Sequence, residues 1–209
     1  MERTRVKRSP NRGHYDDETI RAILKNNYLC HVAFNHQNAP VNIPTLYGLL
    51  GDYIYFHGAT TSRLITNLES GIDVCVAITQ VDGLVLARSA FHHSMNYQSV
   101  VVFGKAKPVS GDLKLEALKA ISDQIIPGRW KEVRAPNAKE MKATTVLQLP
   151  LTEASAKIRT GPPSDDKADY DLPIWAGVVN TPKVYGEVET DPGSKVELPI
   201  SKSVQSLVK

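Results

Sequence analysis

Hydrophobic and polar residues alternate through most of the chain, and this two-residue period predicts strands whose alternate side chains enter a core. From residue 28 to 58, "YLCHVAF" and "APVNIPTLYGLLGDYIYFHG" predict three antiparallel strands with a turn at "GD". A strand pair is expected at "DVCVAITQ" and "LVLARSAF", joined at "VDG". Further strands are expected at "YQSVVVFGKAKPV", "TTVLQLPL", "SAKIRTG" and "LPIWAGVV".

Segments with helical spacing separate these strands. Asp16 or Asp17 caps a short amphipathic helix in "YDDETIRAILKNN", and Thr61 or Ser62 caps a second in "TTSRLITNLESG". "GDLKLEALKAISDQIIPG" predicts a longer helix that ends before Pro127, and a short helical piece is expected near "NAKEMK". About seven closely connected strands with three or four helices predict a barrel whose gaps are filled by helices.

The chain divides into three parts by composition. Residues 1–15 form a basic arm, residues 16–179 a barrel domain, and residues 180–209 a C-terminal extension. The extension is rich in Pro, Gly, Val and Lys and shows no helical period. It is therefore expected to pack along the barrel, to cross a partner, or to be partly mobile.

The formal net charge is +3, and much of the positive excess lies in the arm. A nucleic-acid-binding face carries basic residues over the folded body together with exposed aromatic ones, so no nucleic-acid partner is expected. The arm is interpreted as a solvated, partly disordered terminus, the alternative being a docking segment for an acidic partner. No apolar run approaches the roughly 20 residues that cross a bilayer, which predicts a cytoplasmic protein without a membrane partner. In the arm only Glu2 opposes the basic residues, which are Arg3, Arg5, Lys7, Arg8 and Arg12.

The cysteines and histidines show few catalytic patterns. Cys30 and Cys75 lie in apolar strand segments without a CxxC spacing and are expected to be small buried residues. His92 and His93 are adjacent, so their side chains point to opposite faces of an extended chain, and no metal site is predicted. No GxSxG, GxGxxG or P-loop motif occurs. The alternative to the absence of a metal site is a zinc site built from His31, His57 and one of the adjacent pair, His92 or His93.

The stretch "FHGATTSRL", residues 56 to 64, is a candidate phosphate site. A strand runs into a turn of small residues, and a helix begins near Ser62. Free backbone N–H groups at the helix start, the hydroxyls of Thr61 and Ser62, and the guanidinium of Arg63 together suit a phosphate. The alternative is an ordinary capped helix whose arginine is solvated.

Three stretches carry a family resemblance: "IPTLYGLLGDYIYFHGATTSRLI", "DGLVLARSAFHHSMNYQSVVVFGKA" and "EASAKIRTGPPSDDKADYDLPIWAGVV". They resemble the FMN-binding split-barrel superfamily of pyridoxamine 5′-phosphate oxidase, and within it the nitroimidazole-resistance-protein-like branch. The resemblance covers about residues 5 to 179. It implies a mainly β fold, a six-stranded antiparallel split β-barrel with short flanking helices. It also implies a homodimer that binds FMN in a groove at the dimer interface.

The resemblance also implies roles for individual residues. The strand beside the flavin would contribute Ile43, Pro44, Thr45 and Leu46, and the phosphate turn would be Thr61, Ser62 and Arg63. Isoalloxazine needs both packing surface and polar partners, which Ser94, Met95, Asn96 and Tyr97 would supply. Trp175 would cover the flavin from the partner subunit, or else anchor the core. Lys157 and Arg159 would offer positive charge, the alternative for Arg159 being a surface ion pair.

Two departures from the family pattern limit the functional prediction. Leu64 follows Arg63 where many members carry a second cation, and no Arg-x-His occurs in the second half of the chain, so vitamin B6 oxidation is not assigned. The leading hypothesis is an FMN-dependent oxidoreductase that passes electrons from reduced nicotinamide, NAD(P)H, to a small-molecule substrate. His57 is the titratable candidate for contacting that substrate, or else a structural histidine.

Two other functions are kept open. The first is a non-catalytic flavin- or haem-binding barrel in which His92 or His93 serves as an axial ligand. The second is a regulatory or nucleic-acid-interacting protein that uses the basic arm.

Overall fold

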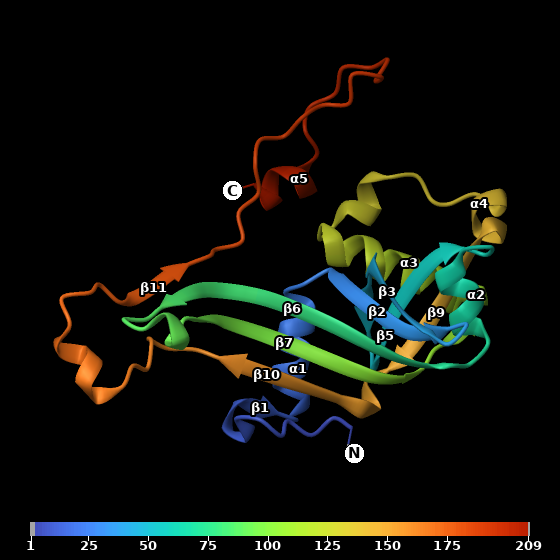
Figure 1. The fold of residues 1–209 in the computed structure, drawn as a ribbon. Helices are drawn as coiled ribbons and strands as arrows, with labels where there is room; N and C mark the ends of the chain where they lie inside the picture. The colour runs from blue at the N-terminus through green and yellow to red at the C-terminus, as the bar shows by residue number, and fades with distance from the viewer. Residues whose placement is uncertain (1–2, 209) are drawn as a thin grey trace.

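The computed structural model describes residues 3–208, which form two antiparallel β-sheets flanked by helices (Figure 1). The seven-stranded sheet has the order β1-β10-β7-β6-β2-β3, with β11 paired to β6, and the four-stranded sheet has the order β4-β5-β9-β8. The strands are β1 (Gly13–His14), β2 (Leu29–His36), β3 (Ala39–Leu46), β4 (Gly48–Leu50), β5 (Tyr53–Ala59), β6 (Asp73–Leu86), β7 (Ser94–Lys105), β8 (Lys107–Val109), β9 (Thr144–Pro150), β10 (Ala154–Arg159) and β11 (Gly177–Asn180).

Short helices fill the gaps between these strands. The α-helices are α1 (Asp17–Lys25), α2 (Arg63–Glu69), α3 (Gly111–Ile125), α4 (Ala138–Ala143) and α5 (Lys202–Leu207). The 3-10 helices are η1 (Pro10–Arg12), η2 (Ala90–His92), η3 (Arg129–Glu132), η4 (Leu151–Glu153) and η5 (Lys167–Asp171). Of the alternative caps, Asp16 caps α1 and Ser62 caps α2, each accepting a backbone N–H bond in the first turn.

Both sheets close around one large hydrophobic core. Alternate strand residues enter it, among them Val32 of β2, Phe56 of β5 and Val76 of β6, and none of the three is exposed. Ile65 and Leu68 of α2 pack against the same core. The predicted mainly β, antiparallel split barrel with flanking helices is therefore confirmed.

Helix α3 packs on the outside of the four-stranded sheet. Tyr55 points away from the barrel core and packs with Ala117, Ile121 and Val146. The two layers approach closely at Gly48, where a Cβ atom would lie 2.5 Å from the backbone nitrogen of Ile121. Only glycine fits at position 48, and its lack of a side chain allows the backbone of α3 to lie directly against the backbone of β4.

The hairpin predicted at "VDG" is wrong. Residues 73–86 form the single strand β6, which pairs with β7 on both sides of a bulge between Val81 and Gly83. The Asp82 carboxylate accepts hydrogen bonds from Gln80 and Gln98, at 2.7 and 3.1 Å, so it does not stabilise a turn. Gly83 instead allows close approach of β11, since a Cβ there would lie 2.9 Å from Val178. Strands β6 and β7 consequently extend beyond the barrel as a projecting ribbon (Figure 1).

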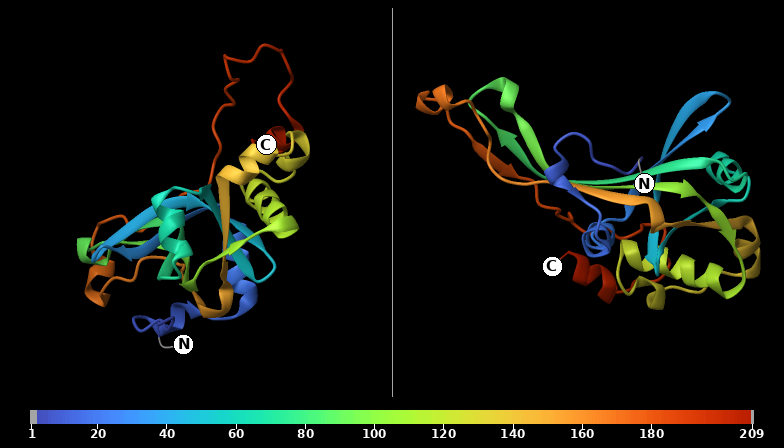
Figure 2. Two further views of the ribbon diagram at one scale, coloured as in Figure 1. Left: turned by 90° about the vertical axis from the view of Figure 1, so that its right-hand side faces the viewer. Right: turned by 90° about the horizontal axis from the view of Figure 1, so that it is seen from below.

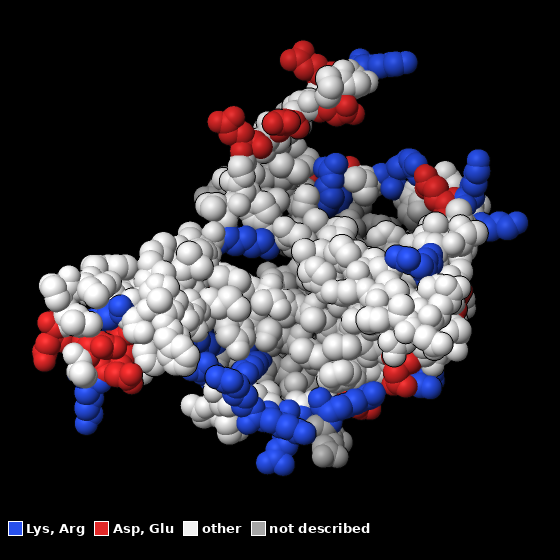
Figure 3. Space-filling model, viewed as in Figure 1, with Lys and Arg blue, Asp and Glu red and all other residues white. Residues whose placement is uncertain are grey.

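The described part of the basic arm is attached to the protein at several points, so the predicted disorder is wrong for residues 3–14, although Arg5, Lys7 and Arg8 are exposed to solvent as predicted. Thr4 is buried, and Gly13 pairs with Lys157 of β10. Arg3 forms ion pairs with Asp73 and Glu153. Figure 3 shows basic side chains gathered along the lower edge of the molecule, where this arm lies. Residues 1 and 2 of the arm lie outside the described part of the chain.

The C-terminal extension contains a helix that the sequence pattern does not predict. Residues 181–201 have no helix or strand, but α5 follows and packs back against the body beside η3 (Figure 2). This helix has only six residues, too few for a clear hydrophobic period. Within residues 3–208, no helix is long and apolar enough to cross a membrane.

Candidate functional site

The predicted phosphate turn forms a capped helix start. The Ser62 side chain accepts a hydrogen bond from the Ile65 backbone N–H at 3.3 Å, which occupies part of its bonding capacity. Thr61 and Arg63 are exposed. Within the described residues, the Arg63 guanidinium makes no hydrogen bond or ion pair, so it is free to contact an anion.

The other predicted flavin residues fall into two separated groups within one chain. Ile43, Pro44, Thr45 and Leu46 lie on β3, an edge strand of the larger sheet, whose only partner strand is β2 among those described. The polar segment 94–97 lies near the tip of the projecting ribbon, where Met95 pairs with Leu84. In Figures 1 and 2 this tip and helix α2 lie at opposite ends of the molecule. One chain by itself therefore does not bring all the predicted residues into one groove.

Arg159 is buried and does not belong to a surface ion pair. Its guanidinium donates to the side-chain oxygen of Asn96 and, at 3.3 Å, to the backbone carbonyls of Gly161 and Pro162. No carboxylate pairs with it among residues 3–208. Burial, together with the nearby charge of Arg12, lowers its pKa from the ordinary value. No carboxylate among the described residues thus compensates the positive charge at this end of β10, where Lys157 also lies.

Trp175 is 67% exposed, so it is not a core anchor. It lies between η5 and β11, beside other exposed apolar residues of the projecting segment: Leu172, Ile174 and Tyr170. A large aromatic side chain left in solvent on a projecting segment is typical of a residue that contacts a partner or ligand.

A pocket of about 610 Å³ lies between the four-stranded sheet, α3 and the segment 129–144. His57 of β5 and Leu46 at the end of β3 line it from the sheet side, and Ile121 lines it from α3. Trp130 and Met141 line it from η3 and α4. Its size is within the range of roughly 300–1,000 Å³ that small-molecule and cofactor sites occupy, and its walls are mostly apolar.

Polar contacts hold the segment 129–144 in place. Lys114 of α3 donates to the carbonyls of Met141 and Thr144, at 2.7 and 2.5 Å. At the pocket rim Arg134 donates to both oxygens of Glu140, at 2.8 and 2.5 Å. This pairing lowers the pKa of Glu140 to about 2, so both side chains are ionised at neutral pH.

His57 is the titratable group inside the pocket. The β5 register places it opposite Val146, on the face that α3 covers. Its Nδ1 is buried and has no hydrogen-bond partner within the described part of the chain. Burial lowers the pKa of His57 from its ordinary value of 6.5, so the imidazole is neutral at pH 7. A neutral imidazole is the form that binds a metal ion.

The lowered pKa of His57 predicts a pH dependence of stability. The unfolded chain binds a proton at this residue below about pH 6.5, whereas the folded chain binds it only at lower pH. We therefore expect the free energy of unfolding of the ligand-free protein to fall as the pH drops below about 6.5. Urea denaturation of the native protein and His57→Gln at several pH values measures this, and the decrease should be smaller in the variant. Identical pH profiles would contradict the prediction.

The histidines of the zinc alternative do not come together. No group of three or more His, Cys, Asp or Glu residues with metal-ligand geometry occurs in residues 3–208. His93 Nδ1 accepts a hydrogen bond from the Ala87 backbone N–H at 3.1 Å, and His92 Nε2 lies 3.6 Å from the Asp166 carboxylate.

The two cysteines form no disulfide. Cys30 is buried and Cys75 is half-buried, and both are free thiols.

The antiparallel split barrel, with short helices filling its gaps, is the fold class of this protein. The family model of pyridoxamine 5′-phosphate oxidase matches residues 16–158, and the chain belongs to this family. The predicted family resemblance is therefore confirmed. No curated protein matches the sequence significantly.

Three solved structures are similar to this chain. The flavocytochrome Anf3 from Azotobacter vinelandii is 38% identical, with a TM-score of 0.91 over 99% of this chain and 97% of its own. The FAD and haem binding protein from Mycobacterium smegmatis is 34% identical, with a TM-score of 0.90 over 94% of this chain and 97% of its own. A putative 5-nitroimidazole antibiotic resistance protein from Bacteroides thetaiotaomicron is 20% identical, with a TM-score of 0.59 over 70% and 86%, and it supports the fold alone.

Sequence reasoning selected His57 and Leu46 but missed the rest of the pocket. Trp130, Arg134 and Met141 come from a stretch with few helical or strand signals, and no motif links them to β5. The only local signal was the capping pattern around "NAKEMK", which places α4 but does not show what it faces.

Proposed function

We propose that this chain is a redox protein that binds both a flavin and a haem, with the haem in the His57 pocket. The observation that carries this proposal is a neutral, unpartnered imidazole in a mostly apolar pocket of about 610 Å³. Two structural relatives that cover nearly the whole chain, at 38% and 34% identity, are a flavocytochrome and an FAD and haem binding protein. Their similarity supports a flavin and a haem here.

The residues of the pocket fit a haem. His57 would supply a nitrogen to the iron, and the apolar side chains of Leu46, Ile121 and Trp130 would supply the packing surface that a flat macrocycle needs. A bound haem transfers single electrons, and the pocket's role is to orient it and to exclude water. This assignment replaces the earlier hypothesis that His57 contacts the substrate directly.

His57 is a better axial ligand than His92 or His93. The latter two lie at the tip of the projecting ribbon, and each already contacts a neighbouring group of the ribbon or the adjoining loop.

The flavin site is proposed to be shared between two copies of the chain. One copy supplies β3 (Ile43 to Leu46) and the turn at 61–63, and the projecting ribbon of the other supplies the segment 94–97 with Trp175. The separation of the two groups within one chain supports this arrangement, as does the exposed Trp175. The uncompensated charge of Arg159 and Lys157 would face the anionic parts of the flavin. The protein is thus proposed to be a homodimer.

FMN is the proposed flavin, since the turn at 61–63 suits one terminal phosphate. A flavin held there would supply hydride and single-electron chemistry, so the two sites together suit an oxidoreductase that carries electrons from reduced nicotinamide to a small acceptor. Chromatography of the released flavin tests this assignment, because FMN and FAD separate cleanly. Release of FAD would show that the site also holds the adenylate.

The experiment that tests the whole proposal is visible spectroscopy of the purified protein supplied with haem and flavin. The proposal predicts a Soret band together with the two flavin bands, and all should change when reduced nicotinamide is added without oxygen. A protein that retains flavin but no haem would refute the haem assignment. A protein that retains neither would refute both.

Arg63→Ala is expected to weaken flavin binding about tenfold, because it removes one charge-assisted hydrogen bond to the phosphate. Its guanidinium makes no other polar contact in the described structure, so the substitution should leave the free energy of unfolding nearly unchanged. Flavin fluorescence titration measures the affinity, with Lys119→Ala, an exposed cation of α3, as the matched control. Equal affinity in both variants would remove Arg63 from the site.

A further inference from the structure

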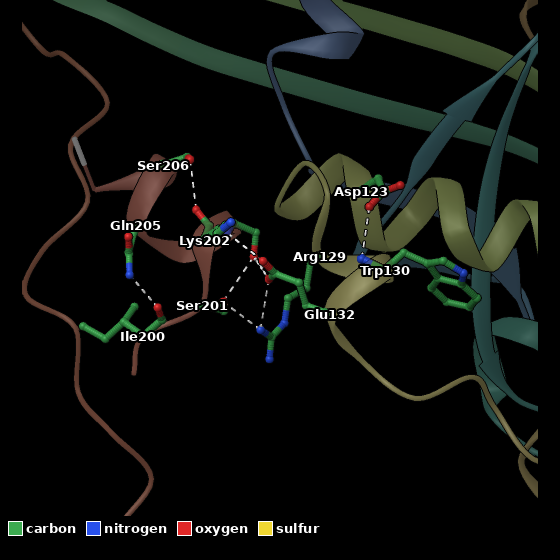
Figure 4. A network of polar contacts seen from close by, with 10 residues as sticks. Asp123, Arg129, Trp130, Glu132, Ile200, Ser201, Lys202, Gln205 and Ser206 are labelled. Carbon is green, nitrogen blue, oxygen red and sulfur yellow. Dashed lines mark hydrogen bonds and ion pairs between the residues drawn. The ribbon is translucent and has the colours of Figure 1, made fainter. Parts of the chain in front are cut away.

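The C-terminal helix α5 is bonded to the wall of the His57 pocket. The backbone N–H of Ser203 donates to Glu132 at 3.1 Å, and the Ser203 hydroxyl donates to the other oxygen of the same carboxylate. Arg129 donates to the Ser201 hydroxyl at 2.9 Å. Figure 4 shows these contacts between α5 and η3, with the Trp130 ring on the other side of η3. The helix that the sequence pattern missed therefore contacts the segment that carries Trp130.

The contact between α5 and η3 is shielded from solvent on the α5 side, at Ser203. Ser203 is only 8% exposed, although most of residues 181–200 are exposed and have no regular structure. The hydrogen bonds from Ser203 lower the pKa of Glu132, which keeps its carboxylate ionised and the bonds charge-assisted at neutral pH. At the near end of the extension, the Lys183 ammonium lies 4.3 Å from the centre of the Tyr28 ring. Both ends of the extension are thus attached to the body.

The wall segment has separate attachments on its two sides. On the α3 side, Asp123 accepts the Trp130 backbone N–H at 3.2 Å. On the tail side, Glu132 and Arg129 are the groups that bond to α5. η3 is a single turn of 3-10 helix without a fully buried residue. A backbone bond from Arg129 N–H to the Ile126 carbonyl, at 3.1 Å, ties its start to the end of α3, and the contacts with α5 hold its other side.

We propose that Glu132 is a positioning residue through which α5 holds the Trp130 wall, so that the C-terminal extension controls exchange of the pocket's ligand. This inference rests on the proposed haem function for the identity of the ligand, but not for the attachment itself. Breaking the Glu132 contact should let η3 move away from α3 and open the pocket. Ligand release from the pocket should then become faster. Flavin affinity should not change, because the turn at 61–63 at the start of α2 makes no contact with η3 or α5 in the described structure.

The test uses three variants: Glu132→Ala, Ser203→Ala and the double variant that combines these two substitutions. The control is Ser206→Ala, because the Ser206 hydroxyl bonds only to the Lys202 carbonyl within α5. The first readout is amide hydrogen exchange of residues 129–134 in protein without haem. The second is the rate at which bound haem transfers to a scavenging apoprotein. Flavin affinity confirms that each variant is folded.

We expect exchange and haem transfer to accelerate about tenfold in Glu132→Ala, and by less in Ser203→Ala, which keeps the backbone N–H bond to Glu132. The double variant should match Glu132→Ala, because that substitution already removes both bonds to Ser203. The Ser206→Ala control should match the native protein. Unchanged exchange and transfer rates in Glu132→Ala would overturn the inference. If the native protein binds no haem, faster exchange at 129–134 would still support the attachment while the proposed function failed.

Discussion

His57→Ala is expected to remove haem from the protein, with the haem content of the purified variant at least tenfold below that of the native protein. The substitution deletes the axial nitrogen and leaves an apolar pocket in which iron has no ligand from β5. Because His57 Nδ1 has no hydrogen-bond partner within residues 3–208, the change breaks no polar contact of that atom. Flavin content should therefore be retained, and the ratio of Soret to flavin absorbance measures the effect.

The matched control is His92→Ala, which alters one of the two histidines, His92 and His93, that the sequence suggests as haem ligands. It should retain a full Soret band, since His92 lies on the projecting ribbon. Imidazole added to His57→Ala should restore part of the haem binding by entering the space that the side chain leaves. Loss of haem in His92→Ala, with retention in His57→Ala, would move the site to the ribbon.

Gly48→Ala is expected to destabilise the protein by about 3 kcal/mol, the upper end of the usual cost of overpacking. The added methyl would lie 2.5 Å from the Ile121 nitrogen and 2.7 Å from the Ala120 carbonyl carbon. These are backbone atoms of α3, so the whole helix must shift to make room. Such a loss is a large fraction of the 5–15 kcal/mol by which domains are typically stable. Urea denaturation of the ligand-free protein measures it.

The same shift should also weaken ligand binding in the pocket, because Ile121 and Ser122 of α3 form part of its wall. Gly186→Ala is the control, since a Cβ at that position would meet no atom within 4 Å. It should change the free energy of unfolding by less than about 0.5 kcal/mol. A Gly48→Ala variant as stable as the control would show that α3 does not rest on β4 as described.

Local signals predicted the elements that depend on neighbouring residues. Asp16 and Ser62 cap their helices because a short polar side chain reaches a backbone N–H three residues later, and this needs no tertiary contact. The alternation in β2 matches its buried face. In β5, by contrast, residues 54–56 are all buried, because α3 covers the face that the alternation assigns to solvent. The prediction of a turn at "VDG" was wrong because β7 pairs with residues on both sides of these positions and β11 packs against Gly83. Both contacts join segments that are distant in the sequence.

The family and the mainly β barrel could be predicted from the sequence, since each depends on local pattern or motif. The candidate flavin residues were also selected there, but only the tertiary structure divides them into two separated groups within one chain. Only the tertiary structure decided that Arg159 is buried without a carboxylate, that Trp175 is exposed, and that His57 lies in a pocket. That pocket combines β3, β5, α3 and the segment 129–144, and α5 bonds to its wall from the far end of the chain. No local pattern encodes such a site, because its walls meet only when the sheet and helices pack.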